Sequence, residues 1–446
     1  MNKIFLLIRI VFTTVLAALA FSTSAQKFSV VGGNELSYNY YEDYKSTSGI
    51  NTVSIVYGTA DKRLQFESSS TNAIVWYTYE DVLTPIASEQ TGRTSSIPLT
   101  QSECGYVVMD GDKPYYVYII DYIKHPLSLS SVAVQENGTA CDIVTLEIEG
   151  VGEKMNYYAF NNKMPYEVKR DIVISYNTLV WNEELLQYDE TAQEIVLNQF
   201  SPSYPVAAPL CNTIFTVSGD KFLSAWNMTQ EVTTSEYQTV AIEAQARATQ
   251  TYRDALNELD REPSNLGGSA PAEIEFQAYY TDAVNHAEWQ FSREGNFSTI
   301  THRYTDDLLR YTFREEGTTY VRLVVTSNNE SCIYECEPMV VTIGTSMLEI
   351  PNAFSPGTVD GKNDEWRVAF KSLVEFRCWI FNKQGVEMYH SENPREGWDG
   401  KHSGRLASPG VYYYVIEARG ADGVEYKRSG HINLMRSKKN SSNKNE

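Results

Sequence analysis

Apolar side chains fall on every second position in short segments throughout this chain of 446 residues. Residues 144–148, 274–278 and 376–380 are clear examples. A period of two is that of a half-buried β-strand, whereas an amphipathic helix repeats every three to four residues. Clusters of Gly, Asn, Asp and Ser, which favour turns, separate these segments. The pattern therefore predicts an all-β chain of tandem immunoglobulin-like β-sandwich domains.

The region between residues 350 and 436 contains five distinctive segments in a fixed order. They are Ile-Pro-Asn-Ala-Phe-Ser-Pro at 350–356, a predicted hairpin at 380–385, Trp-Asp-Gly at 398–400, Pro-Gly-Val-Tyr-Tyr-Tyr-Val-Ile at 409–416, and a predicted last strand at 430–436. Aromatic and β-branched residues suit a pleated, half-buried surface. The region is predicted to form a small β-sandwich of its own.

These segments resemble the gliding-motility-associated C-terminal domain of exported Bacteroidetes proteins, one of the two common type IX secretion signals. Lys383 and Gln384 stand where that family usually has Arg and Trp, and the chain continues past Arg436, near which the family usually ends. The resemblance implies a sorting domain over residues 347–436, the type IX translocon as partner, and an outer-membrane β-barrel of the PorP/SprF family as a second partner. The motif positions that carry the resemblance are Pro351, Asn352, Phe354, Pro356, Gly385, Trp398, Asp399, Gly400, Gly410, Tyr412 and Gly430.

The loop that follows the first of these segments contains the weak metal candidates Asp360, Asn363 and Asp364. Calcium needs six or more oxygen ligands from a shaped loop. The turn-forming tendencies of Asp, Asn and Gly explain the same residues without an ion. The loop also has one residue more than the common form of the family. We therefore predict no metal site and no cofactor.

The N-terminal residues 1–25 have the composition of a secretory signal peptide, with cleavage predicted between Ala25 and Gln26. A membrane anchor is the alternative, but Arg9 leaves an uninterrupted apolar run shorter than the roughly 20 residues that a spanning helix needs. The protein is thus expected to pass through the periplasm and to reach the outer membrane or cell surface.

Two further β-sandwich domains are predicted at residues 26–125 and 126–262. The first contains strand candidates at 52–57, 73–79, 106–109 and 115–122. In the second, alternation over residues 239–249 favours a closing strand despite the high Ala content. A short helix is predicted at 251–261, followed by a Gly/Pro-containing linker at 263–271.

Residues 272–346 resemble a PKD-type immunoglobulin-like domain through a Trp-x-Phe strand and a long hairpin at 311–325. The resemblance implies that Trp289 is the buried aromatic residue of the core. The basic tail at 437–446 is rich in Ser, Asn and Lys and is predicted to be disordered.

The six cysteines are consistent with an exported protein. Cys332 and Cys336 could bridge one another or both stay free, and the pairing of Cys104, Cys141 and Cys211 is left open. Cys378 alternates with apolar residues and is predicted to be a buried single thiol.

No segment matches a catalytic or phosphate-binding motif, and the net charge of −20 argues against nucleic acid as a partner. We therefore predict no catalytic residues and a non-enzymatic exported surface protein that acts in adhesion, gliding or surface assembly. Other surface proteins or glycans are further candidate partners. One alternative is a resident accessory component of the secretion or gliding apparatus, bound to the PorP/SprF-like barrel. Another is a secreted hydrolase with its site in residues 27–248.

Overall fold

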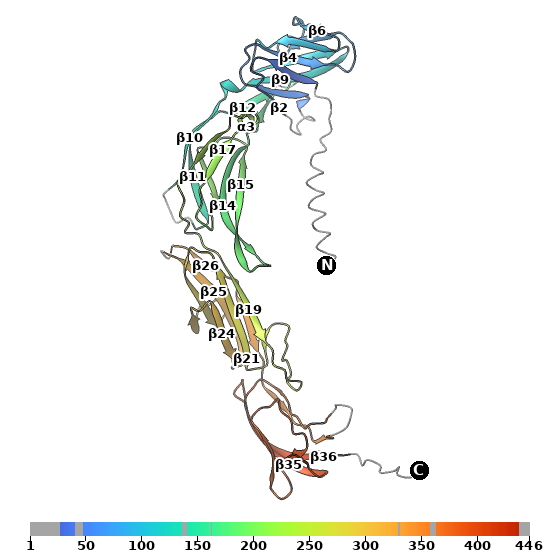
Figure 1. Ribbon diagram of the computed structural model, residues 1–446, viewed down its shortest axis with the longest axis vertical. Helices are drawn as coiled ribbons and strands as arrows, with labels where there is room; N and C mark the ends of the chain where they lie inside the picture. Colours follow the sequence, from blue (N-terminus) through green and yellow to red (C-terminus); the bar gives the residue numbers. More distant parts are fainter. Residues whose placement is uncertain are drawn as a thin grey trace, which may run out of the picture.

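The computed structural model describes residues 27–40, 48–135, 141–161, 163–328, 331–356 and 363–436. They form four β units that follow one another along the long axis of the molecule (Figure 1). Nearly all described elements are strands; η1 (Tyr122–Lys124) and α3 (Lys221–Ala225) are short helical turns. No helix in the described part of the chain is long and apolar enough to cross a membrane. The predicted signal peptide at 1–25, its cleavage site at Ala25 and Gln26, and the tail at 437–446 lie outside the described residues.

The first unit is a sandwich of two sheets. One sheet has the order β1-β4-β7-β6 and contains β1 (Phe28–Gly32), β4 (Lys62–Glu67), β6 (Glu89–Thr91) and β7 (Thr94–Pro98). The other has the order β2-β3-β9-β8-β5 and contains β2 (Ser37–Tyr40), β3 (Thr52–Val56), β5 (Ile74–Thr78), β8 (Cys104–Asp110) and β9 (Lys113–Asp121). Trp76 is fully buried in its core and donates its indole N–H to Ser95 Oγ at 2.9 Å. The four predicted strands of this unit are confirmed.

The second unit consists of three sheets. They have the orders β10-β11-β16, β12-β13 and β15-β14-β17-β18. Their strands are β10 (Leu127–Val134), β11 (Ile143–Gly152), β12 (Met155–Tyr158), β13 (Pro165–Val168), β14 (Ile172–Asn182), β15 (Gln187–Leu197), β16 (Ser203–Ala207), β17 (Thr216–Gly219) and β18 (Gln230–Thr233). Its apolar core is continuous with side chains of the first unit, including Tyr40, Val53 and Tyr122. The two units therefore share a packed junction.

An ion pair lies buried at this junction. Arg170 and Asp220 are both fully buried, and their side chains approach to 2.8 Å. Asp220 also accepts hydrogen bonds from the Tyr122 hydroxyl at 3.1 Å and from the backbone N–H of Leu223 at 3.0 Å. A buried charge is tolerated when it is paired and hydrogen-bonded in this way.

The third unit begins earlier than the sequence indicated. The strand expected at 239–249 is observed as β19 (Ala244–Thr251), but it pairs antiparallel with β21 (Ala272–Tyr280). It therefore belongs to the third unit and does not close the second, which corrects the predicted assignment. Alternation identifies a strand, whereas the choice of partner depends on contacts far away in the sequence.

The predicted helix at 251–261 is also corrected, because this segment consists of turns. Its polar groups bond to the fourth unit: Leu259 N–H donates to Phe370 O at 2.8 Å, and Asn257 Nδ2 donates to Val368 O at 2.7 Å. These tertiary contacts override a weak helix propensity. The predicted linker contributes β20 (Leu266–Gly268), which pairs parallel with β27 (Met339–Ile343).

The third unit packs two sheets around Trp289, as predicted. Trp289 is 1% exposed, and its ring centroid lies 5.6 Å from that of Phe276. One sheet has the order β19-β21-β24, and β22, β23, β25 and β26 join β20 and β27 in the other. The remaining strands are β22 (Val284–Ser292), β23 (His302–Tyr304), β24 (Leu308–Phe313), β25 (Gly317–Ser327) and β26 (Ile333–Glu335).

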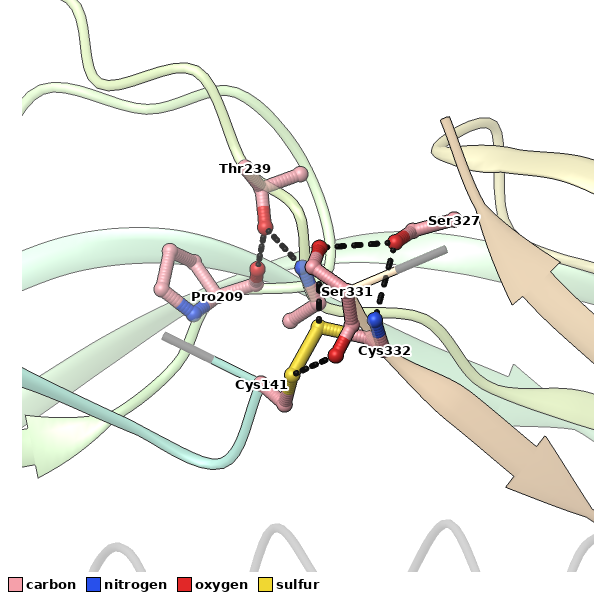
Figure 2. Close-up of a disulfide and its surroundings, with 7 residues drawn as sticks. Cys141, Pro209, Thr239, Ser327, Ser331 and Cys332 are labelled. Carbon is pink, nitrogen blue, oxygen red and sulfur yellow. Dashed lines mark hydrogen bonds between the residues drawn. A yellow bond between two sulfur atoms is a disulfide. The ribbon is translucent and has the colours of Figure 1, made fainter. Parts of the chain in front are cut away.

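A disulfide joins the second and third units. Figure 2 shows Cys141, which lies just before β11, bonded to Cys332, which lies just before β26. Cys332 and Cys336 were expected either to bridge one another or both to stay free. Both expectations are wrong, because Cys332 bridges Cys141, 191 positions earlier in the chain. Cys378 is 2% exposed and unpaired, which confirms the predicted buried thiol. The other free cysteines are Cys104, Cys211 and Cys336.

The fourth unit contains a five-stranded sheet of order β29-β36-β35-β31-β32. These strands are β29 (Ala353–Phe354), β31 (Leu373–Phe381), β32 (Glu387–Ser391), β35 (Gly410–Gly420) and β36 (Glu425–Leu434). Two short pairs accompany the sheet: β28 (Met347–Glu349) with β30 (Ala369–Lys371), and β33 (Lys401–His402) with β34 (Arg405–Leu406).

Candidate recognition surfaces of the C-terminal unit

The aromatic motif residues form the core of the fourth unit. Trp398 is 1% exposed, and its ring centroid lies 5.3 Å from Phe354 and 4.9 Å from Tyr412. Its indole N–H donates to Lys401 O at 2.8 Å, and the Tyr412 hydroxyl donates to Ser408 O at 2.8 Å. These residues hold three separate segments together, so their role is to build the fold.

Trp366 completes this core and is a residue that the sequence reasoning missed. Its indole N–H donates to the carbonyl of Pro351 at 2.7 Å. Its backbone pairs with that of Trp398 in an isolated bridge. Trp366, Val368 and Phe370 are all buried. Their period-two spacing in the sequence was the signal that could have found them.

Two motif glycines are required by close packing. Gly400 has a φ of 72°, and a Cβ there would lie 2.8 Å from the Pro356 ring. A Cβ on Gly430 would lie 2.5 Å from the Tyr414 hydroxyl. By contrast, an added Cβ at Gly385 or Gly410 meets no heavy atom within 4 Å.

The polar motif residues act on neighbouring backbone. Asp399 accepts the backbone N–H of Lys401 at 2.9 Å, which is a local turn. The carbonyl of Asn352 accepts the N–H of Asn433 at 2.9 Å and ties the first motif to the last strand.

The metal candidates are only partly described, because Asp360 lies outside the described residues. Asn363 has a left-handed φ of 55°, and its carbonyl accepts the Ser355 N–H at 2.8 Å. Asp364 follows it in the chain. Within the described ranges, no group of three or more His, Cys, Asp or Glu side chains is placed to hold a metal ion.

The outward face of the sheet exposes an apolar stripe that we call the outer stripe, made of Trp379, Phe381, Val411, Tyr413 and Val415. Trp379 pairs with Val415, and Phe381 pairs with Tyr413, on neighbouring strands β31 and β35. Tyr413 is 48% exposed and Val411 is 46% exposed. An exposed row of large apolar side chains is unusual on a soluble domain and often marks a contact surface.

A groove of about 1000 Å³ adjoins one end of the outer stripe. It brings the motif residues Gly410 and Tyr412 beside Lys383 and Gln384, the two positions that depart from the family pattern. A partner that binds this end of the sheet would therefore contact both the residues that match the family pattern and the residues that depart from it.

The sheet also has an open edge along most of β36. The short strand β29 pairs only with Asn433 and Leu434. The N–H of Asn433 points toward β29 and away from β35. In an antiparallel strand every second residue directs its N–H and C=O groups to the same side. The N–H and C=O groups of Lys427, Ser429 and His431 therefore also point away from β35. In the described part of the chain, no strand pairs with that side of residues 425–432. Such an edge is a ready template for strand addition.

Comparisons with known proteins identify two parts of the chain. Residues 348–434 match the CHU_C type IX secretion signal domain, and residues 133–234 match a fibronectin type III domain. Both are non-catalytic kinds of domain. The chain thus carries a C-terminal type IX secretion signal preceded by immunoglobulin-like units, which marks it for export and for delivery to the surface or outer membrane.

No curated protein matches the chain in sequence. Among solved structures, a tetra-tandem repeat in the extending region of a large adhesion protein is 10% identical, with 84% of this chain and 95% of that chain covered and a TM-score of 0.19. Three N-terminal domains of the bacteriophage RB49 highly immunogenic outer capsid protein (Hoc) are 10% identical, with 70% and 100% covered and a TM-score of 0.22. TM-scores this low carry no conclusion about this chain.

Proposed function

We propose that this chain, which carries a type IX secretion signal, is a non-enzymatic surface protein that acts in adhesion, gliding or surface assembly. The observation that supports the proposal is the placement of the signal in a separate terminal unit with an open strand edge and an exposed apolar stripe. The other three units extend away from it along the molecular axis (Figure 1). This arrangement leaves the distal units available for contacts outside the cell.

The partners proposed for the terminal unit are the type IX translocon and an outer-membrane barrel of the PorP/SprF family. Strand addition along β36 would supply main-chain hydrogen bonds, and the outer stripe would supply apolar contact beside them. Neither surface depends on the buried motif residues directly. Those residues keep the sheet folded so that its edge and outer stripe have a fixed shape.

Cell fractionation with a pull-down tests this proposal. The full chain is compared with a chain that ends before Ile350, and both carry the same affinity tag. We expect the full chain at the surface or outer membrane together with a barrel protein, and the truncated chain in the periplasm. If both chains localise alike and neither captures a barrel, the terminal unit is not the signal that this chain uses.

A second candidate function is a resident accessory component of the secretion or gliding apparatus. It is favoured by the strand orders of the four units, which all differ, since a spacer-type adhesin would repeat one unit. The two roles differ in retention. A resident component stays bound to its barrel after delivery, whereas an adhesin acts through its distal units and tolerates release from the barrel.

A further inference from the structure

A cleft of about 780 Å³ lies at the junction between the first and second units. This volume falls in the range of roughly 300–1,000 Å³ that is typical of small-molecule sites. Its walls come from β8 and β9 of the first unit and from β12 and the turn after it in the second unit. Clefts between domains are favoured places for ligand sites because both walls can contribute groups.

One wall of the cleft is aromatic. The ring centroids of Tyr118 and Tyr158 lie 5.9 Å apart, and those of Tyr79 and Phe160 lie 5.1 Å apart. In each pair, one ring comes from the first unit and the other from the second. Tyr158 is 40% exposed, so a broad ring face is available to a ligand.

Tyr79 is held in this wall with an unpartnered hydroxyl. Its ring lies directly against Gly105, where an added Cβ would approach the ring to 2.1 Å. The hydroxyl oxygen is buried and has no hydrogen-bond partner in the described part of the chain. A buried polar group without a partner is costly, and such groups in native proteins call for an explanation. The hydroxyl is also closed to solvent, so Tyr79 shapes the wall and does not itself contact a ligand in the cleft.

The charges around the cleft are mixed in sign. Three acids, Glu80, Glu103 and Asp121, line it together with Lys124 and Lys163. Glu103 already accepts the backbone N–H of Asp121 at 2.8 Å, and Asp121 accepts the N–H of Gly58 at 3.0 Å. These two acids therefore hold the backbone together and are not a free pair for acid–base chemistry. The cleft is suited to binding a ligand and not to cleaving it.

We infer that this cleft binds a neutral oligosaccharide. The apolar face of a sugar ring stacks on Tyr158, and its hydroxyls pair with Glu80 and Lys163 at the rim. Charges of both signs offer hydrogen bonds to a neutral polyol without favouring an anion or a cation. The inference goes beyond the proposed function, since it holds whichever route exports the chain.

The test uses the purified full-length mature chain in solution, so it does not depend on export. A panel of neutral gluco-, xylo- and manno-oligosaccharides is titrated by calorimetry against the chain and three variants. Tyr158→Ala removes an exposed stacking face, and Glu80→Gln replaces an exposed carboxylate at the rim of the cleft with an amide of the same shape. Tyr252→Ala removes a tyrosine of similar exposure that lies outside the cleft and outside the terminal unit, and it serves as the matched control.

We expect at least one oligosaccharide to bind, with at least about tenfold weaker binding by Tyr158→Ala and roughly three- to tenfold weaker binding by Glu80→Gln. Tyr252→Ala should bind like the parent chain. Glu80→Gln separates a ligand contact from a structural role, because an exposed side chain that makes no ligand contact would leave the affinity unchanged.

Three outcomes would overturn the inference. The first is no binding by any member of the panel, and the second is binding that neither cleft variant weakens. The third is shortening of the oligosaccharide during incubation, which would assign hydrolysis to this region in place of binding. None of these outcomes bears on delivery by the terminal unit, which fractionation tests separately.

Discussion

Two tryptophans of the C-terminal unit differ in what they contribute to its stability, and substituting each one measures the difference. Trp398 is buried against Phe354 and Tyr412, whereas Trp379 lies on the outer stripe and stacks on His390 at 5.3 Å. Trp398→Ala should destabilise the unit by about 3–5 kcal/mol, because it leaves a cavity in a small core. Trp379→Ala should cost about 1 kcal/mol or less.

Hydrogen exchange of the β35 amides in the full chain measures this difference. A loss of about 3 kcal/mol corresponds to roughly a hundredfold faster exchange, since 1.4 kcal/mol is a factor of ten. Equal acceleration by both substitutions would show that the outer stripe stabilises the unit as much as its core does.

At the residue scale, the sequence predicted burial well where a residue sits in a regular pattern. Cys378 lies in an alternating strand and is buried as its pattern predicted, and Trp289 is buried as the resemblance to a PKD-type domain implied. Trp366 was missed because it follows a loop and begins a segment that only partly forms strand. The orphaned Tyr79 hydroxyl could not be predicted at all, since its burial depends on side chains from the second unit such as Phe160.

At the scale of single elements, β36 leads to a prediction about how the secretion machinery recognises the terminal unit. Ser429→Pro removes a backbone N–H that points to the open edge and leaves the ladder with β35 intact. If the edge is read by strand addition, this variant should lose most surface delivery. Ser429→Ala keeps the N–H and should be delivered normally.

Fractionation of cells that express each variant, with the β35 exchange rates as a check on folding, distinguishes the possible outcomes. A folded Ser429→Pro chain that is delivered at the parent level would exclude this edge, and the outer stripe would become the main candidate for contact with the translocon.

The strands themselves were largely predictable, and their partners were not. Alternation located the strand near 239–249, but β19 pairs with β21 across a turn-rich segment and so joins the third unit. The segment at 251–261 has residues that tolerate a helix, yet its backbone and side chains bond to residues such as Val368 and Phe370 more than a hundred positions later. Local propensity carries no information about such distant hydrogen bonds.

For the molecule as a whole, buried phenols predict a loss of stability in alkali. Burial raises the pKa of Tyr79, Tyr106, Tyr118 and Tyr122 in the folded chain. An unfolded tyrosine ionises near pH 10, so the unfolded chain releases these protons first. The contribution to stability is fully present below about pH 10 and is lost as the pH rises above it.

A pH titration followed by phenolate absorbance and near-ultraviolet circular dichroism checks this. Tyrosines on the surface should ionise first with the dichroism unchanged, and the four buried tyrosines should ionise only as the dichroism is lost. Ionisation of every tyrosine near pH 10 in a chain that keeps its dichroism would contradict the prediction.

The disulfide between Cys141 and Cys332 should control how the distal and terminal halves of the molecule are oriented. The second and third units each have cores of their own, so the bond is not needed to fold either one. Beside it, the β14–β15 hairpin contacts the third unit, where Trp181 lies 5.3 Å from Tyr279 and Tyr188 bonds to Glu243 at 3.4 Å. The Glu183–Arg247 ion pair adds a third contact from the same hairpin.

We therefore expect Cys141→Ser combined with Cys332→Ser to leave the far-ultraviolet circular dichroism unchanged and to broaden the range of shapes seen by X-ray scattering. Cys211→Ser, which removes a free thiol of the second unit, is the matched control and should scatter like the parent chain. Identical scattering from the double variant would mean that the hairpin holds the junction by itself.

A broader range of shapes would mean that one covalent bond keeps the distal cleft at a fixed distance and angle from the terminal unit. A protein anchored at one end and binding at the other would depend on that rigidity.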